Sequence, residues 1–107
     1  MAFSPTQAYL AMKAGASYVS IVLSRLDAVA NESHILVEET VRAKENYGFA
    51  TEIIAGSMKT QNHVLACLRA GLDIATIPET LFFQMFEHPL TDIALDTFAK
   101  DWKNVPQ

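Results

Sequence analysis

The sequence predicts an α/β fold, in which helices alternate with about three strands of one parallel sheet. Three short segments rich in apolar and β-branched residues read as strands, at residues 18–23, 51–55 and 73–77. Helical segments separate them, and strict alternation is typical of right-handed βαβ units. The first strand is apolar almost throughout, which predicts burial on both faces.

The first helix begins at Ser4, where three signals agree. Ser4 can cap the helix, Pro5 suits the first helical position, and Gln7 completes a capping box. Gly15 ends this helix, because glycine readily takes the left-handed conformation found after helix C-termini.

Four further helices complete the predicted order. The first two, at about 32–47 and 61–70, are followed by Gly48 and Gly71. A short helix at about 80–87 precedes His88-Pro89, and Thr91 is the predicted cap of the last helix. One face of that last helix carries Leu95, Phe98, Trp102 and Val105.

Composition indicates one globular domain over residues 1–107. The chain is 50% hydrophobic and 19% charged, and its formal net charge of −4 argues against nucleic-acid and anionic-membrane partners. No apolar run approaches the roughly 20 residues that cross a bilayer. The N-terminal segment lacks signal-peptide features, and the single cysteine, Cys67, excludes an internal disulfide. We therefore expect a cytoplasmic protein.

A candidate anion site lies where the second strand passes into the third helix. Ser57 and Lys59 follow the strand, and the helix starts near Thr60. A helix N-terminus supplies free backbone N–H groups and the positive end of the helix dipole. A second cation, Arg25, closes the first strand, and parallel strands end at the same sheet edge. The sequence therefore predicts a phosphate pocket formed by Arg25, Ser57 and Lys59.

A short internal sequence repeat favours a barrel of repeated β/α units. A basic residue, Ala and Gly end a helix at 13–15 and again at 69–71, and an isoleucine lies six places after each glycine. A closed (β/α)₈ barrel needs eight strands and typically about 200 residues or more. Three strands can therefore form only part of such a barrel.

Three motifs follow one another along the chain: FSPTQAYLAMKAGASYVSIVLSRLD, AGSMKT and RAGLDIATIP. They are similar to an F-S-x-x-Q-A helix start with its strand and strand-end arginine, to A-[GA]-S-[FM]-[KR], and to A-G-x-x-x-x-T-[IL]-P. Those motifs belong, in this order, to the transaldolase family. Over essentially its whole length, the chain resembles the C-terminal half of that family, most closely the short fructose-6-phosphate aldolase-like branch.

The resemblance implies the last three strands of a class I aldolase TIM barrel that acts on sugar phosphates such as fructose 6-phosphate. In the family, a lysine on an earlier strand forms a Schiff base, and an aspartate on the first strand and a glutamate or glutamine on a middle strand help with proton transfers through water. These positions lie upstream of Met1, so we expect no catalytic residue here and no activity from this chain alone. Arg25 and Ser57 match the family's phosphate-binding residues, and Lys59 matches its second basic position. Val22 stands where the family usually has an aromatic residue that helps hold a catalytic water.

Each candidate also has an ordinary structural interpretation. Arg25 could pair with Asp27, Ser57 could stabilise a turn, and Lys59 could simply face solvent. Lys59 is a poor substitute for the Schiff-base lysine, because it lies on the loop beyond the strand.

The remaining chemistry-bearing residues predict neither a metal nor a cofactor. His34, His63 and His88 show no ligand spacing with Cys67 or with one another, and we expect them to be surface or capping residues. We expect Cys67 to pack as a small residue on the third predicted helix, and not to act as a nucleophile. No GxGxxG or P-loop pattern is present.

Three functions remain open from the sequence. The chain could be a truncated or split aldolase or transaldolase, a non-catalytic phosphosugar-binding or interaction module, or a fragment without separate function. Open sheet edges predict a homo-oligomer or a complementing half-barrel chain. The apolar residues at 82–86 fit either packing on the barrel wall or, with the Trp102 helix, contact with a neighbouring subunit, as C-terminal helices make in the family's oligomers.

Overall fold

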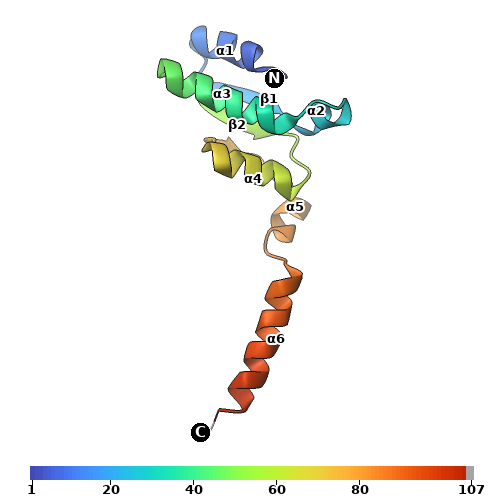
Figure 1. Ribbon diagram of the computed structural model, residues 1–107. Coiled ribbons are helices and arrows are strands. Elements are labelled where there is room, and N and C mark those ends of the chain that lie inside the picture. The colour runs from blue at the N-terminus through green and yellow to red at the C-terminus, as the bar shows by residue number, and fades with distance from the viewer. Residues whose placement is uncertain (106–107) are drawn as a thin grey trace.

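The computed structural model describes residues 1–105 and has the predicted α/β architecture (Figure 1). The elements in chain order are α1 (Pro5–Lys13), β1 (Tyr18–Val22), α2 (Ser24–Ala28), α3 (Ser33–Tyr47), β2 (Glu52–Gly56), α4 (Gln61–Ala70), β3 (Ile74–Ala75), α5 (Glu79–Gln84) and α6 (Pro89–Lys103). The strands form one parallel sheet in the order β1-β2-β3. This arrangement confirms the expected part of a (β/α)₈ barrel.

The strand register brings the carboxyl ends of β1 and β2 to the same sheet edge. Pairing runs from Tyr18 with Glu52 to Val22 with Gly56. β3 has only two residues, fewer than the five predicted. Beyond it, the amide and hydroxyl of Thr76 both donate to the Ala55 carbonyl, at 3.0 and 2.8 Å, so the chain still follows β2.

Helices cover one face of the sheet. α1 contacts β1 and α3, and α3 contacts α4, so the three form a layer against the strands (Figure 1). Side chains alternate along a strand, and those on the covered face are buried, as Val19 and Ile21 show. On the opposite face Tyr18 is 59% exposed, and Ser20 is half-buried. The prediction that the first strand is buried on both faces is therefore wrong for Tyr18 and Ser20, although Val22 at the end of the strand is buried on that second face.

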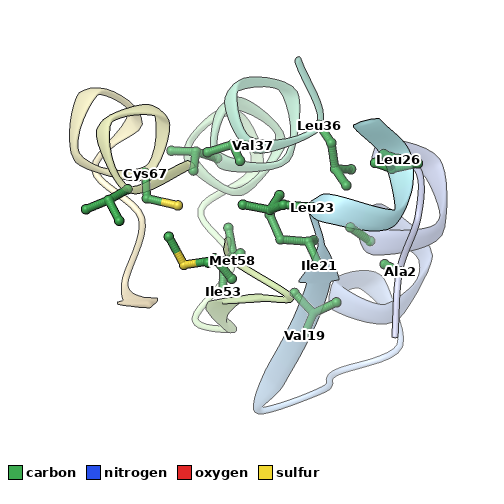
Figure 2. Close-up of a cluster of buried hydrophobic side chains, with 14 of the residues drawn as sticks. Ala2, Val19, Ile21, Leu23, Leu26, Leu36, Val37, Ile53, Met58 and Cys67 are labelled. Atoms are coloured by element: carbon green, nitrogen blue, oxygen red, sulfur yellow. The ribbon is translucent and has the colours of Figure 1, made fainter. Parts of the chain in front are cut away.

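The hydrophobic core lies between the sheet and this helical layer (Figure 2). Ile21, Ile53 and Val37 are fully buried at its centre. Cys67 of α4 packs into the same cluster, which confirms its packing role. Burial raises the pKa of its thiol to about 11, so the unreactive protonated form dominates at neutral pH.

Residues before α1 lie along the free edge of β1. The Ala2 amide donates to the Ser20 carbonyl at 2.7 Å, and the Val22 amide donates to the Ala2 carbonyl at 3.2 Å, which forms a one-residue parallel bridge. The Ser4 cap follows as predicted, with its hydroxyl accepting from the Gln7 amide at 3.2 Å. The Gln7 side chain accepts from Phe3 rather than from Ser4, so the reciprocal bond lies one residue earlier than in a standard capping box.

The C-terminal helices lie apart from the core. α6 begins at Pro89, and the His88 ring caps it by accepting from the Leu90 amide at 3.0 Å. Thr91 is therefore not the cap, because Pro89 already suits the first helical position. α6 projects away from the sheet and has no buried residue (Figure 1). Of the α5 side chains only Leu81 is buried, so the predicted packing of residues 82–86 on the barrel wall does not occur within residues 1–105.

The helices of the described part of the chain are too short or too polar to cross a membrane.

Candidate functional site

Arg25 lies on the short helix α2, whereas the sequence predicted that it closes the first strand. β1 ends at Val22, and α2 begins two residues later. Leu23 and Leu26 explain this turn, because both are buried in the core and the three-residue spacing places them on one helical face. The Arg25 side chain is exposed.

Ser57 begins the loop after β2 in a left-handed backbone conformation, with φ of 54°. That conformation costs an L-residue roughly 1–2 kcal/mol, so contacts elsewhere must hold it. The Ser57 carbonyl accepts from the Ser24 amide at 3.1 Å, which joins this loop to the start of α2. The Met58 side chain is buried in the core, in the same cluster as Ile53 (Figure 2). Met58 thus anchors the loop, while Ser57 and Lys59 on either side of it remain exposed.

Lys59 lies immediately before the N-terminus of α4. The Thr60 hydroxyl accepts from the His63 amide at 3.3 Å and caps the helix, which confirms the predicted start near Thr60. The Lys59 amide donates to His63 Nδ1 at 3.0 Å, and the Thr60 amide donates to the same atom at 3.4 Å. The backbone of Lys59 is therefore held by a side chain of α4.

His63 also contacts Asp27, a pairing that the sequence reasoning missed. His63 Nε2 lies 2.5 Å from Asp27 Oδ2. Because Nδ1 accepts two N–H bonds, the ring proton belongs on Nε2, which donates to the carboxylate. His63 is 6% exposed, so the expectation of a surface histidine is wrong, although its capping role is confirmed.

Asp27 does not form the predicted alternative ion pair with Arg25 among the described residues. Its carboxylate accepts from His63 and, at the start of α3, from the Ser33 amide at 3.2 Å and the Ser33 hydroxyl at 3.0 Å. The hydrogen bond from His63 is the main cause that lowers the pKa of Asp27; burial opposes it, and the Ser33 bonds add to it. Asp27 therefore links α2, α3 and α4.

A groove of about 520 Å³ lies over this linkage. Lys59, Asp27, His63 and His34 are among its lining residues, whereas Arg25 and Ser57 are not. The structure thus brings the backbone segments of the three predicted residues together, but their side chains do not share this groove. Within residues 1–105, no group of three or more His, Cys, Asp or Glu residues could hold a metal ion.

Val22 occupies the opposite side of the sheet from the core. It is 3% exposed but does not belong to the core cluster, as expected from its alternation with the core residue Ile21. Its aliphatic side chain can neither donate nor accept a hydrogen bond. The second face of the sheet therefore carries a buried apolar group where β1 ends.

Known proteins match this chain along nearly its whole length. Residues 1–106 match the family model described as transaldolase/fructose-6-phosphate aldolase. The chain is 51% identical over 104 residues to a probable transaldolase of Hydrogenobaculum sp. (strain Y04AAS1), an alignment that covers 97% of this chain and 48% of that protein. It is 50% identical over 107 residues to a probable transaldolase of Aquifex aeolicus (strain VF5), covering 100% and 49%.

A probable transaldolase 1 of Listeria monocytogenes serotype 4b (strain F2365) is 47% identical over 103 residues, covering 96% of this chain and 48% of that protein. The chain therefore spans about half the length of the curated relatives it matches. These matches extend over the strands, the α2 turn and the Ser57 loop alike, and the chain belongs to the transaldolase/fructose-6-phosphate aldolase family.

Proposed function

We propose that these 107 residues act as one domain, the phosphate-binding part of an aldolase or transaldolase for sugar phosphates such as fructose 6-phosphate. The hydrogen bond between the Ser24 amide and the Ser57 carbonyl carries this proposal. It holds the segment with Arg25 beside the loop with Ser57 and Lys59, next to the N-terminus of α4.

The three side chains supply complementary donors for a phosphate. Arg25 offers a planar fork for two phosphate oxygens, Ser57 a neutral hydroxyl, and Lys59 a mobile positive charge. The dipole of α4 favours an anion at the same place. Each charge-assisted hydrogen bond contributes about 1.5–3 kcal/mol, so loss of one cationic group should be measurable.

The Schiff-base step of the family would need residues outside this chain. Its five lysines lie on helices or on the Ser57 loop, and none lies on a strand. A nucleophilic lysine needs a pKa depressed by burial or by neighbouring cations. We therefore expect this chain alone to bind phosphate without making or breaking carbon–carbon bonds.

A second candidate function is a non-catalytic phosphosugar-binding module that self-associates or complements a separate half-barrel. The open face of the sheet favours it, because Tyr18 and Glu52 are exposed there in the position of a barrel interior. Both candidates use the same phosphate residues and differ in whether a lysine-bearing half is recruited.

The test is a titration of the 107-residue chain with fructose 6-phosphate, followed by the backbone amide signals of residues 57–59. Arg25→Ala should weaken binding at least tenfold, because the guanidinium fork is lost. Arg42→Ala is the matched control, since Arg42 is an exposed arginine on α3 that pairs only with Glu39 among the described residues. Equal affinities in both variants would contradict the proposed site.

Borohydride treatment in the presence of fructose 6-phosphate tests the absence of Schiff-base chemistry. We expect no gain in mass. A trapped adduct would show that a lysine of this chain reacts, and peptide mapping would identify it.

A further inference from the structure

We propose that His63 is a positioning residue of the phosphate site, holding the Lys59 loop with one ring nitrogen and the α2 helix with the other. The inference rests on the proposed phosphate-binding function. It concerns how two segments, distant in sequence, are kept in one geometry. His63 is not among the residues proposed to contact the phosphate.

On the loop side, the ring fixes the main chain immediately before α4. The Lys59 amide donates to Nδ1 at 3.0 Å, and the Thr60 amide donates to it at 3.4 Å. The ring belongs to the first turn of α4, whose Val64 and Cys67 are buried in the core. The position of the Lys59 backbone is therefore set from the packed part of the molecule.

On the other side, the ring holds α2. His63 Nε2 donates to Asp27 Oδ2 at 2.5 Å, and Asp27 is two residues beyond Arg25. α2 has only five residues and no side-chain N-cap. Its ties to the rest of the molecule include the buried Leu26 and the bonds that Asp27 makes, so Asp27 restrains the helix that carries Arg25.

One half of the α4 capping box does not depend on the ring. The Thr60 hydroxyl already accepts from the His63 backbone amide at 3.3 Å. The ring supplies the other half, since Nδ1 accepts from the Thr60 amide, and the bond from the Lys59 amide to the same atom acts on the loop before the helix. Since the ring is buried, a lost Nδ1 acceptor would leave the Lys59 amide without this partner.

The experiment compares two amide replacements that each keep one half of the linkage. His63→Asn places an acceptor oxygen near the position of Nδ1 and loses contact with Asp27. His63→Gln can place an N–H group near the position of Nε2 and loses the acceptor for Lys59. Cys67→Ala is the stability control, because it removes a buried group one turn later on the same helix.

Two readouts are measured on the 107-residue chain: amide hydrogen exchange of Lys59 without ligand, and affinity for fructose 6-phosphate. His63→Gln should abolish the protection of Lys59, which His63→Asn should keep. Both variants should bind at least fivefold more weakly than the unaltered chain, because each releases one segment. Cys67→Ala should lower stability and leave the affinity within about twofold.

Three outcomes would overturn the proposal: an unprotected Lys59 amide in the unaltered chain, equal protection in the two His63 variants, or an affinity loss in Cys67→Ala as large as theirs. If the unaltered chain fails to bind fructose 6-phosphate, the proposed function fails. In that case, the exchange pattern of Lys59 still decides whether His63 positions the loop.

Discussion

Helices α3 and α6 are equally long, and each has an apolar stripe, yet only α3 is packed. α3 buries Leu36, Val37 and Val41 in the core. α6 presents Leu95, Phe98 and Trp102 at 61–66% exposure, and the ring centroids of Phe98 and Trp102 lie 6.5 Å apart. An amphipathic pattern therefore identifies a helix and its apolar face, but it does not identify the surface against which that face packs.

The largest expected effect comes from the same substitution in the two regions. Ile53→Ala removes a fully buried side chain from β2 and should lower the free energy of unfolding by about 2–5 kcal/mol. Ile93→Ala on α6 should change it by less than about 0.5 kcal/mol, since that side chain is exposed. Urea denaturation followed by circular dichroism measures both.

Sedimentation of the same proteins shows whether this contrast between α3 and α6 holds in solution. If Ile93→Ala costs more than about 1 kcal/mol and also shifts the sedimentation coefficient, α6 is covered by another copy of the chain. The contrast would then describe one isolated chain and not the protein in solution.

Much of the packed region could be predicted from sequence, because local rules act there together. Gly48 and Gly71 follow α3 and α4 with left-handed φ of 67° and 74°, as their positions indicated. The β1 and β2 segments are recognisable from their β-branched and apolar residues. The helix α2 was missed, because the five residues of Ser24–Ala28 are too few to show a periodic pattern.

The candidate site was predictable only where its residues follow strands or match the family. Arg25, Ser57 and Lys59 were found in this way, and whether they bind phosphate remains a prediction. The contact between Asp27 and His63 spans 36 positions, so no local spacing indicates it. One signal could have suggested this contact. Asp27 follows the first strand and His63 lies in the first turn of the helix after the second strand, so both residues lie at the same sheet edge.

A smaller effect should appear as a pH dependence of stability. Because the pKa of Asp27 is lowered in the folded chain, its ionised form favours folding at a pH above the ordinary value of 3.8, and this contribution is lost as the pH falls. Asp27→Asn should therefore unfold at lower urea concentration than the unaltered chain at about pH 5 and above. The two midpoints should converge below about pH 4. Urea midpoints that differ equally at every pH would show that packing, and not the carboxylate charge, makes the difference.

Asp73 provides a second carboxylate for the same measurement. Burial raises the pKa of Asp73, but hydrogen bonds from Lys44 Nζ at 2.7 Å and from the Ile53 amide at 2.8 Å outweigh burial and hold the pKa below its ordinary value. It ties α3 to β2, away from the candidate site. Asp73→Asn should show the same convergence at low pH while leaving phosphate binding unchanged. If Asp73→Asn bound phosphate more weakly, the contact between α3 and β2 would also shape the site, in addition to the bonds that Asp27 makes with His63 and Ser33.

The smallest effect concerns two buried threonines in the packed region. The hydroxyl of Thr51 donates to the Ala16 carbonyl at 2.6 Å, whereas the hydroxyl of Thr40 has no partner within residues 1–105. Thr40→Val keeps the shape of the side chain and removes a buried polar group, so the free energy of unfolding should stay equal or rise by up to about 1 kcal/mol. Thr51→Val should lower it by about 1 kcal/mol, because a hydrogen bond is lost. If Thr40→Val lowered the free energy of unfolding as much as Thr51→Val, the Thr40 hydroxyl would have a hydrogen-bond partner in solution. Water would then reach this hydroxyl inside the helical layer, despite its apolar neighbours.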